Sequence, residues 1–171
     1  MNPMPELETG RLRLRAWREA DLDPLHEFYC DPVCAEIYGS HVSRADVWRR
    51  IAVALGHWQL KGFGLWALEE KASGEFVGYA GLWFPLEFAD VEVGWGVMPA
   101  HRGKGFAPEA AARARDFGYA EAGLTRLVSY ILPSNRASIR VATRLGAAAD
   151  GEFELHGKPH LVFRHPTPTH H

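Results

Sequence analysis

Cysteine is scarce in this chain, and no long hydrophobic run occurs in it. The only two cysteines among 171 residues, Cys30 and Cys34, lie four positions apart around an Asp-Pro pair. We therefore expect free thiols, without a disulfide framework or a metal site. No stretch approaches the roughly 18 apolar residues of a membrane-spanning helix, and the first ten residues lack the apolar centre of a secretory signal. These absences predict a cytoplasmic protein with no membrane association.

An excess of one charge sign is also missing. The 19 basic and 21 acidic residues give a formal net charge of −2 and are spread along the whole length. A nucleic-acid partner would require a basic face that neutralises a phosphate backbone, so we expect no such partner. At 47% apolar content, the length suits one well-buried core.

The domain boundary is predicted close to the end of the sequence. We expect a single domain over residues 1–165 and a disordered or artificially added tail over residues 166–171. The segment HPTPTHH is typical of such a tail, and its first residue, His165, is also the last residue of the predicted final strand.

Strand and helix patterns follow one another in an irregular order. Residues 10–17 indicate a half-exposed strand, with Leu12 and Leu14 on its buried side and Arg11, Arg13 and Arg15 on its exposed side. Helices are predicted at 19–30, 44–60, after residue 105 and after Asn135, with a loop or short helical turn at 31–42; strands are predicted at 62–70, 75–84, 90–98, 124–132, 151–156 and 159–165. The pattern predicts an α/β fold of the α+β kind, with a mixed sheet and helices on its faces.

A glycine turn, RGKG at 102–105, stands between the strand-like VEVGWGV and an alanine-rich helix with Pro108 near its start. A strand that feeds through such a turn into a helix aims backbone N–H groups and the positive end of the helix dipole at one point. The sequence therefore predicts an anion site. It is not a Walker loop, because Met98 occupies the first glycine position, nor a dinucleotide fingerprint, because Pro108 replaces the third glycine.

The pattern Arg-x-x-Gly-x-Ala at 102–107 resembles the pyrophosphate-binding loop of the GNAT superfamily of acyl-CoA-dependent N-acetyltransferases. ETGRLRLR, EADLDPL, VEVGWGV and NRASIRVATRLGA occur in the order and spacing of its ribosomal-protein N-terminal acetyltransferase branch, the RimJ/RimL type. This resemblance covers nearly the whole chain. It implies a central, mostly antiparallel sheet that is splayed at the cofactor site and flanked by about four helices. It also implies acetyl-CoA as co-substrate and no metal.

The resemblance further implies roles for individual residues. Glu92 would take the proton from the incoming amine, directly or through a water, because a protonated amine has no lone pair. Ser138 would return a proton to the departing thiolate, since the tyrosine that many members carry seven residues after Asn135 is Ala142 here. The implied cofactor-binding residues are Val97, Arg102, Gly103, Lys104, Gly105, Phe106, Ala107, Asn135 and Ser138.

These residues also have purely structural interpretations. Gly103 and Gly105 could be ordinary turn glycines, and Glu92 could be an exposed charge at a strand edge or a helix-capping partner. The side chains of Asn135 and Ser138 could serve only to satisfy N–H groups in the first turn of the last helix, and Asn135 could do this while also holding the pantetheine arm. His156 and His160 lie four apart in a predicted hairpin without a third ligand, and we expect surface histidines there.

Together these inferences predict an acetyl-CoA-dependent N-acetyltransferase that works by direct attack in a ternary complex. Neither cysteine is expected in the site, so no acyl-enzyme is predicted. The acceptor stays open between a peptide or protein N-terminal α-amino group and a small amine such as an aminoglycoside, polyamine or amino acid. A non-catalytic acyl-CoA-binding regulatory module is the alternative from another class. A monomer and a homodimer are both compatible with the sequence.

Overall fold

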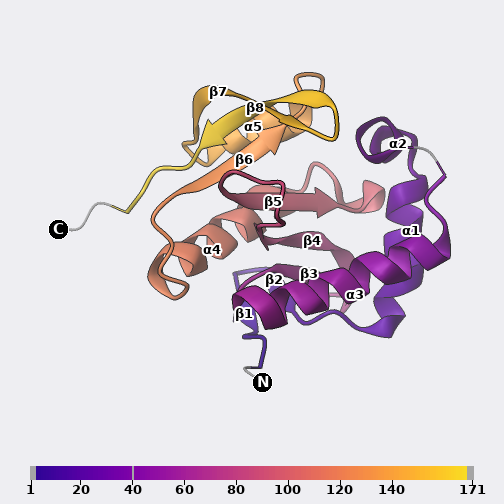
Figure 1. The fold of residues 1–171 in the computed structure, drawn as a ribbon. Helices are drawn as coiled ribbons and strands as arrows, with labels where there is room; N and C mark the ends of the chain where they lie inside the picture. The colour runs from indigo at the N-terminus through magenta and orange to yellow at the C-terminus, as the bar shows by residue number, and fades with distance from the viewer. Residues whose placement is uncertain (1–2, 40, 169–171) are drawn as a thin grey trace.

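The fold was analysed on a computed structural model, which describes residues 3–39 and 41–168. Eight strands form one sheet in the order β1-β2-β3-β4-β5-β6-β8-β7. Neighbouring strands are antiparallel except for β5 and β6, which are parallel. Helix α4 packs on one face of the sheet, and α1 and α3 cover the other (Figure 1). The predicted mixed, mostly antiparallel sheet is confirmed.

The elements follow the predicted order with two additions. They are β1 (Leu7–Glu8), β2 (Leu12–Arg15), α1 (Leu22–Cys30), α2 (Pro32–Tyr38), α3 (Arg44–Lys61), β3 (Leu65–Glu70), β4 (Phe76–Trp83), β5 (Val91–Val97), α4 (Phe106–Ala120), β6 (Leu127–Ile131), α5 (Arg136–Arg144), β7 (Ala148–Leu155) and β8 (Lys158–Arg164). Short 3₁₀ turns precede α1 and α4. The additions are β1 and α2, so five helices flank the sheet where four were expected. No helix of the described ranges has both the length and the apolar character needed to cross a membrane.

Local capping explains where the first helices begin and end. Helix α1 ends at Cys30, before Asp31 and Pro32, as the restriction on residues preceding proline predicts. The carboxylate of Asp31 then accepts the backbone N–H of Cys34 and starts α2, which makes the expected loop or turn a helix. At α3, Ser43 and Asp46 form a reciprocal capping box, a spacing of three residues that is typical of a helix start.

The parallel strands β5 and β6 separate soon after they meet. They pair only at Val91 with Leu127 and at Glu92 with Val128, although β5 stays paired with β4 as far as Val97. Because Met98 donates its N–H to β4, the alternation of an antiparallel ladder turns the N–H groups of Trp95 and Val97 toward β6. The predicted splay is therefore confirmed, and it leaves backbone N–H groups of β5 facing an open gap.

The alternation of Arg15 with leucines predicted an exposed side chain, and this prediction is wrong. It is 4% exposed and forms a two-pronged ion pair with Asp21, at 2.9 and 2.8 Å, while its Nε donates to Glu69 at 2.7 Å. A buried guanidinium is tolerated because two carboxylates replace its hydration. Arg15 therefore ties β2 to β3 and to the segment that leads into α1.

His165, the last residue of the predicted strand 159–165, belongs to the folded core. It is 2% exposed, and its Nε2 lies 2.9 Å from the hydroxyl of Ser129 in β6. Its backbone N–H donates to Leu127, so the chain stays paired with β6 one residue beyond β8. Residues 166–168 have no regular secondary structure, and the expectation for residues 169–171 lies outside the described part.

Candidate active site

The glycine turn and the start of α4 present a row of free backbone donors. Within the described residues, none of the backbone N–H groups from Gly103 to Ala107 donates a hydrogen bond. Gly103 and Gly105 have φ angles of 77° and 82°, a region that favours glycine, and Gly105 is the N-cap of α4. Converging free N–H groups at a helix N-terminus fit a pyrophosphate group such as that of CoA.

Arg11 stabilises this turn through contacts that do not involve the N–H groups of the turn. Its guanidinium donates to the carbonyl oxygen of Lys104 at 2.8 Å and to the carboxylate of Glu109 at 3.1 Å, and it lies 4.7 Å from the centre of the Phe106 ring. Thr9 donates to the same carboxylate at 3.0 Å. These contacts engage a carbonyl oxygen of the turn and leave its N–H groups free. They give a physical role to the ETGRLRLR segment that the sequence pattern alone did not reveal.

A cleft of about 680 Å³ opens beside the turn; we call it the loop cleft. Its walls come from α2, the end of β5, the turn with the start of α4, and α5. It is lined by eight of the nine predicted cofactor-binding residues: Val97, Arg102, Gly103, Gly105, Phe106, Ala107, Asn135 and Ser138. Lys104 is the exception, because its ammonium group lies near His101, 3.2 Å from Nδ1. Lys104 therefore contributes its backbone N–H, and not its side chain, to the row of free donors.

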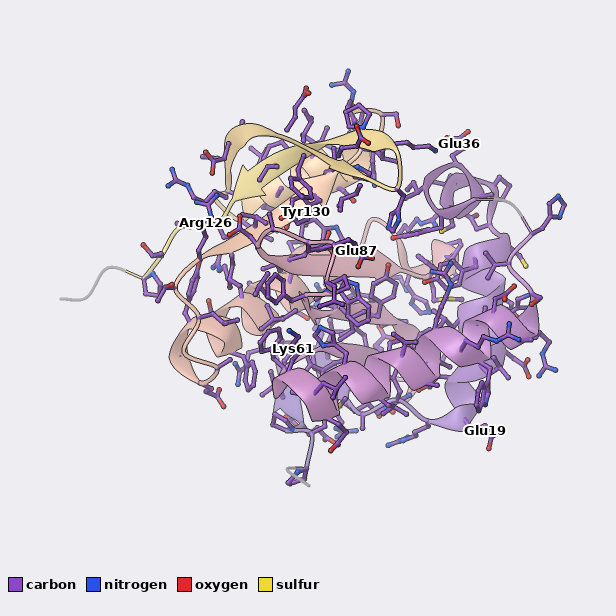
Figure 2. All side chains as sticks on the ribbon, viewed as in Figure 1. Glu19, Glu36, Lys61, Glu87, Arg126 and Tyr130 are labelled. Atoms are coloured by element: carbon purple, nitrogen blue, oxygen red, sulfur yellow. The ribbon has the colours of Figure 1, made fainter. Side chains whose placement is uncertain are left out.

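A second cleft, of about 430 Å³, contains Glu92; we call it the Glu92 cleft. Side chains of α3 line it, as do His156 and His160 of the β7–β8 hairpin. In the ribbon, α3 and the hairpin lie on opposite sides of β4 and β5 (Figure 1). Tyr130 of β6 lies beneath the hairpin (Figure 2) and packs edge-on against Phe88. The two clefts share the residues Ile37, Tyr38, Trp95, Asn135 and Ser138. They therefore meet between α2 and the start of α5.

Glu92 is partly exposed to this cleft and otherwise surrounded by protein. Burial raises the pKa of its carboxyl group to about 8, and the backbone amide of Tyr130 opposes the shift only weakly. Gly94 lies two residues on along the same face, and a Cβ there would contact only Glu92 itself. The carboxyl group therefore faces open space with a pKa near neutrality, as a general base requires.

Asn135 and Ser138 have the local capping contact that the structural interpretation described. The Asn135 side chain accepts the backbone N–H of Ser138 at 3.2 Å, which fixes the start of α5. Both residues nevertheless line both clefts. The cap thus holds the Ser138 side chain at the junction of the two clefts.

Tyr38 is a residue of the candidate site that no sequence pattern singles out from the other aromatic residues around positions 28–48, some of which could be expected to line the acceptor site. It lies at the junction of the clefts, and its hydroxyl is 2.8 Å from the hydroxyl of Tyr79 in β4. Burial raises the pKa of both phenols, so both stay protonated at neutral pH. A Cβ on Gly96 would lie 2.5 Å from the Tyr79 ring and 2.8 Å from Phe28, so this strand glycine serves aromatic packing.

Cys34 corrects the expectation that neither cysteine lies near the site. Its buried side chain lines the loop cleft, where Arg102 contacts its sulfur at 3.5 Å and the carboxylate of Asp31 at 3.0 Å. Burial raises the pKa of the thiol to about 11, which keeps it protonated and weakly nucleophilic. Both cysteines are free, as expected. Among the described residues, no group of three or more His, Cys, Asp and Glu side chains could hold a metal ion.

Comparisons with known proteins agree with this geometry. Residues 11–148 match the family described as an acetyltransferase (GNAT) domain. The uncharacterized protein YkkB of Bacillus subtilis (strain 168) is 31% identical over 169 residues, which cover 95% of this chain and 96% of YkkB. The crystal structure of an acetyltransferase from Agrobacterium tumefaciens str. C58 superimposes with a TM-score of 0.87 at 30% identity, covering 98% of this chain and 97% of that one.

Similarity to the ribosomal-protein branch is weaker. The ribosomal-protein-S5-alanine acetyltransferase of Vibrio fischeri has a TM-score of 0.73 at 16% identity, over 94% of this chain and 95% of that one. At this identity the likeness is one of fold. The RimJ/RimL resemblance is thus supported only at the level of the shared fold, and it leaves the acceptor open.

Proposed function

This chain belongs to the GNAT family of acetyltransferases, and we propose that it acetylates the α-amino group of a peptide or protein by direct attack within a ternary complex. Acetyl-CoA-dependent acetyltransfer follows from membership of the family. The single observation that carries the proposed mechanism is the position of Glu92. Its carboxyl group lines a cleft that joins the predicted CoA cleft at Ser138 and Tyr38. A purely CoA-binding module would have no use for that arrangement.

The residues of this chain divide the work between the two clefts. Acetyl-CoA, when bound, supplies a thioester as acyl donor, and the free N–H groups from Gly103 to Ala107 would hold its pyrophosphate. Glu92 accepts a proton from the acceptor ammonium, which frees the lone pair for attack. The N–H of Val97 faces the gap beside β6 and stabilises the negative charge that develops on the carbonyl oxygen. Ser138 donates its hydroxyl proton to the leaving sulfur and takes up the second proton that the amine nitrogen loses as the amide forms, so that its hydroxyl group is restored.

The lining of the Glu92 cleft favours a peptide over a polycationic small amine. Trp17, Trp83 and Phe88 provide apolar wall, and Glu92 is the only carboxylate among the described residues that line it. An extended peptide presents mostly neutral backbone behind its terminal amine. A polyamine or an aminoglycoside presents further ammonium groups, which would have no acidic partners in this cleft.

The proposal is tested in two steps that separate the donor from the acceptor. Calorimetric titration with acetyl-CoA should give micromolar binding, about 8 kcal/mol, which a Gly105→Glu variant should lose. Thiol release from acetyl-CoA is then measured with free and N-terminally blocked peptides. Release with the free peptides only is the expected result. Acetyl-CoA binding without release for any amine would instead indicate a binding module.

A further inference from the structure

The Glu92 cleft has an unusual charge distribution for a site that receives a cation. Arg49 and Arg50 of α3 line it, while Glu92 is the only carboxylate among its described lining residues. Burial keeps Glu92 largely protonated at neutral pH. The opposite wall adds His156 and His160, which bring no negative charge. The cleft is therefore electropositive around the place where an amine must react.

Arg50 is held in place without a protein anion. Its guanidinium carbon lies 4.6 Å from the centre of the Tyr29 ring, and Tyr29 also lines the cleft. Stacking on an aromatic ring orients a guanidinium and leaves its N–H donors available. Within residues 3–39 and 41–168, the ion pairs of α3 involve Arg44 and Arg49, and none includes Arg50.

Arg49 has an acidic partner, but a replaceable one. It lies 2.9 Å from Asp46 on the surface of α3, where both side chains are largely exposed. Such surface pairs contribute little free energy, so a ligand anion can compete with Asp46. Arg49 is thus a second cation that can exchange its partner for a ligand, whereas the position of the Arg50 guanidinium is set by the Tyr29 ring.

These arginines are separate from those that face the predicted CoA cleft. Arg102, Arg140 and Arg144 line the loop cleft and not the Glu92 cleft, whereas Arg49 and Arg50 line only the Glu92 cleft. The phosphates of CoA therefore do not account for Arg49 and Arg50. Their remaining ligand is the acceptor.

We propose that the acceptor carries an anionic group in addition to its amine, and that Arg50, assisted by Arg49, binds this group and selects the substrate. The inference rests on the proposed function and names its substrate class. The anion is a carboxylate close to the reacting amine. It comes either from acidic side chains that follow the N-terminus of a peptide or from the carboxylates of a free acidic amino acid. Guanidinium groups bind carboxylates through charge-assisted, paired hydrogen bonds.

The test compares three peptides that differ in the charge of two side chains, together with two small amines. Thiol release from acetyl-CoA is measured with C-terminally amidated tetrapeptides that carry aspartate, asparagine or lysine at positions two and three, with free glutamate, and with spermidine. The aspartate peptide is expected to have a KM about tenfold lower than its asparagine counterpart. A higher kcat/KM with glutamate than with the aspartate peptide would assign the anion to a free amino acid and overturn the peptide acceptor of the proposed function. The reverse order would support both the peptide acceptor and this inference.

Variants on one helix locate the effect. Arg50→Gln should raise the KM for the acidic acceptor about tenfold while kcat stays within about twofold, and it should leave the asparagine peptide unchanged. Arg44→Gln is the matched control, because Arg44 pairs with Asp23 at 2.7 Å and lines neither cleft. Equal KM values for the aspartate, asparagine and lysine peptides, or equal effects of both variants, would overturn this inference alone. A preference for spermidine would overturn this inference together with the peptide acceptor of the proposed function. Acetyl-CoA binding without thiol release for any amine would overturn the proposed function and this inference with it.

Discussion

The hydroxyl of Ser129 in β6 donates a 2.7 Å hydrogen bond to the carbonyl oxygen of Val93 in β5. Both residues lie one position beyond the last paired residues of the two strands. The Ser129 oxygen in turn accepts the Nε2–H of His165 at 2.9 Å. Burial, with a smaller contribution from Arg115, lowers the pKa of His165 to about 4, so the imidazole is neutral at physiological pH. This side-chain bridge takes the place of the backbone pairing that ends at the splay.

Removing the bridge should destabilise the fold. Ser129→Ala leaves the Val93 carbonyl and the His165 Nε2–H unpaired in the core, which costs about 1–3 kcal/mol. Denaturant unfolding measures the loss as a lower midpoint. Ser134→Ala, an exposed serine before α5, is the control and should unfold like wild type. If both variants unfold alike, the bridge contributes nothing to stability.

The contacts of Arg11 with Lys104 and Glu109 at the glycine turn should affect CoA binding. Arg11→Ala frees the Lys104 carbonyl and loosens the turn, and we expect acetyl-CoA to bind about threefold to tenfold more weakly, the loss of about one hydrogen bond. Arg11→Lys keeps the charge but cannot bridge the carbonyl and Glu109 with the same geometry. It should bind with intermediate affinity. Calorimetry with acetyl-CoA gives both values, and unchanged affinity in both variants would remove Arg11 from the site.

The raised pKa of Glu92 predicts how the rate depends on pH. Only the carboxylate accepts a proton, so kcat/KM should rise with pH and level off above about 8, the pKa of this group. Glu92→Gln should lower turnover near neutral pH about a hundredfold and regain part of it at high pH, where the amine is already deprotonated. Steady-state rates from pH 6 to 10 check both curves. A variant that matches wild type across this range would exclude Glu92 as the base.

The same pKa has a consequence for stability. The folded protein keeps Glu92 protonated up to about pH 8, whereas the unfolded chain ionises it near its ordinary value of 4.5. Stability is therefore lost as the pH rises from about 4.5 to 8. Glu92→Gln removes this pH-dependent loss of stability. The melting temperature of the variant should therefore exceed that of wild type at pH 8 and equal it near pH 4. A lower melting temperature at pH 8 would show that the carboxyl group is not desolvated.

Ser138 and Tyr38 both place a hydroxyl at the junction of the clefts, so their roles can be separated kinetically. If Ser138 returns the proton to the leaving sulfur, Ser138→Ala should lower kcat about tenfold to a hundredfold and leave acetyl-CoA affinity unchanged. Tyr38→Phe keeps the ring and loses the bond to Tyr79, and we expect a smaller change in kcat. A larger loss in Tyr38→Phe would transfer the role to this phenol.

Much of the fold could be predicted because its signals are local. Helix α3 follows from its apolar spacing and from the Ser43–Asp46 capping box, and the glycine turn follows from four adjacent residues. The burial of Arg15 could not be predicted, since its alternation with leucines is that of a surface strand. Its partner Glu69 lies 54 positions away in the sequence, and only the sheet brings the two together.

The candidate site was predictable to a similar degree. The anion turn and Glu92 stand next to strand glycines, where a sequence pattern can identify them. Tyr38 and Arg50 reach the clefts only because α2 and α3 pack over β4 and β5, which no local pattern records. The bond of the His165 side chain to Ser129 could not be predicted either, because the residues after His165 are typical of a tail and Ser129 lies in another strand.

The separate linings of the loop cleft and the Glu92 cleft affect the order of events in a catalytic cycle. Because the clefts share only the residues at their junction, we expect each molecule to bind whether or not the other is already present. Initial-rate plots should therefore intersect, with random order of addition. Desulfo-CoA should compete with acetyl-CoA and not with the amine. An acceptor and the product CoA should also be able to bind the protein at the same time. This abortive complex should slow the reaction when CoA accumulates.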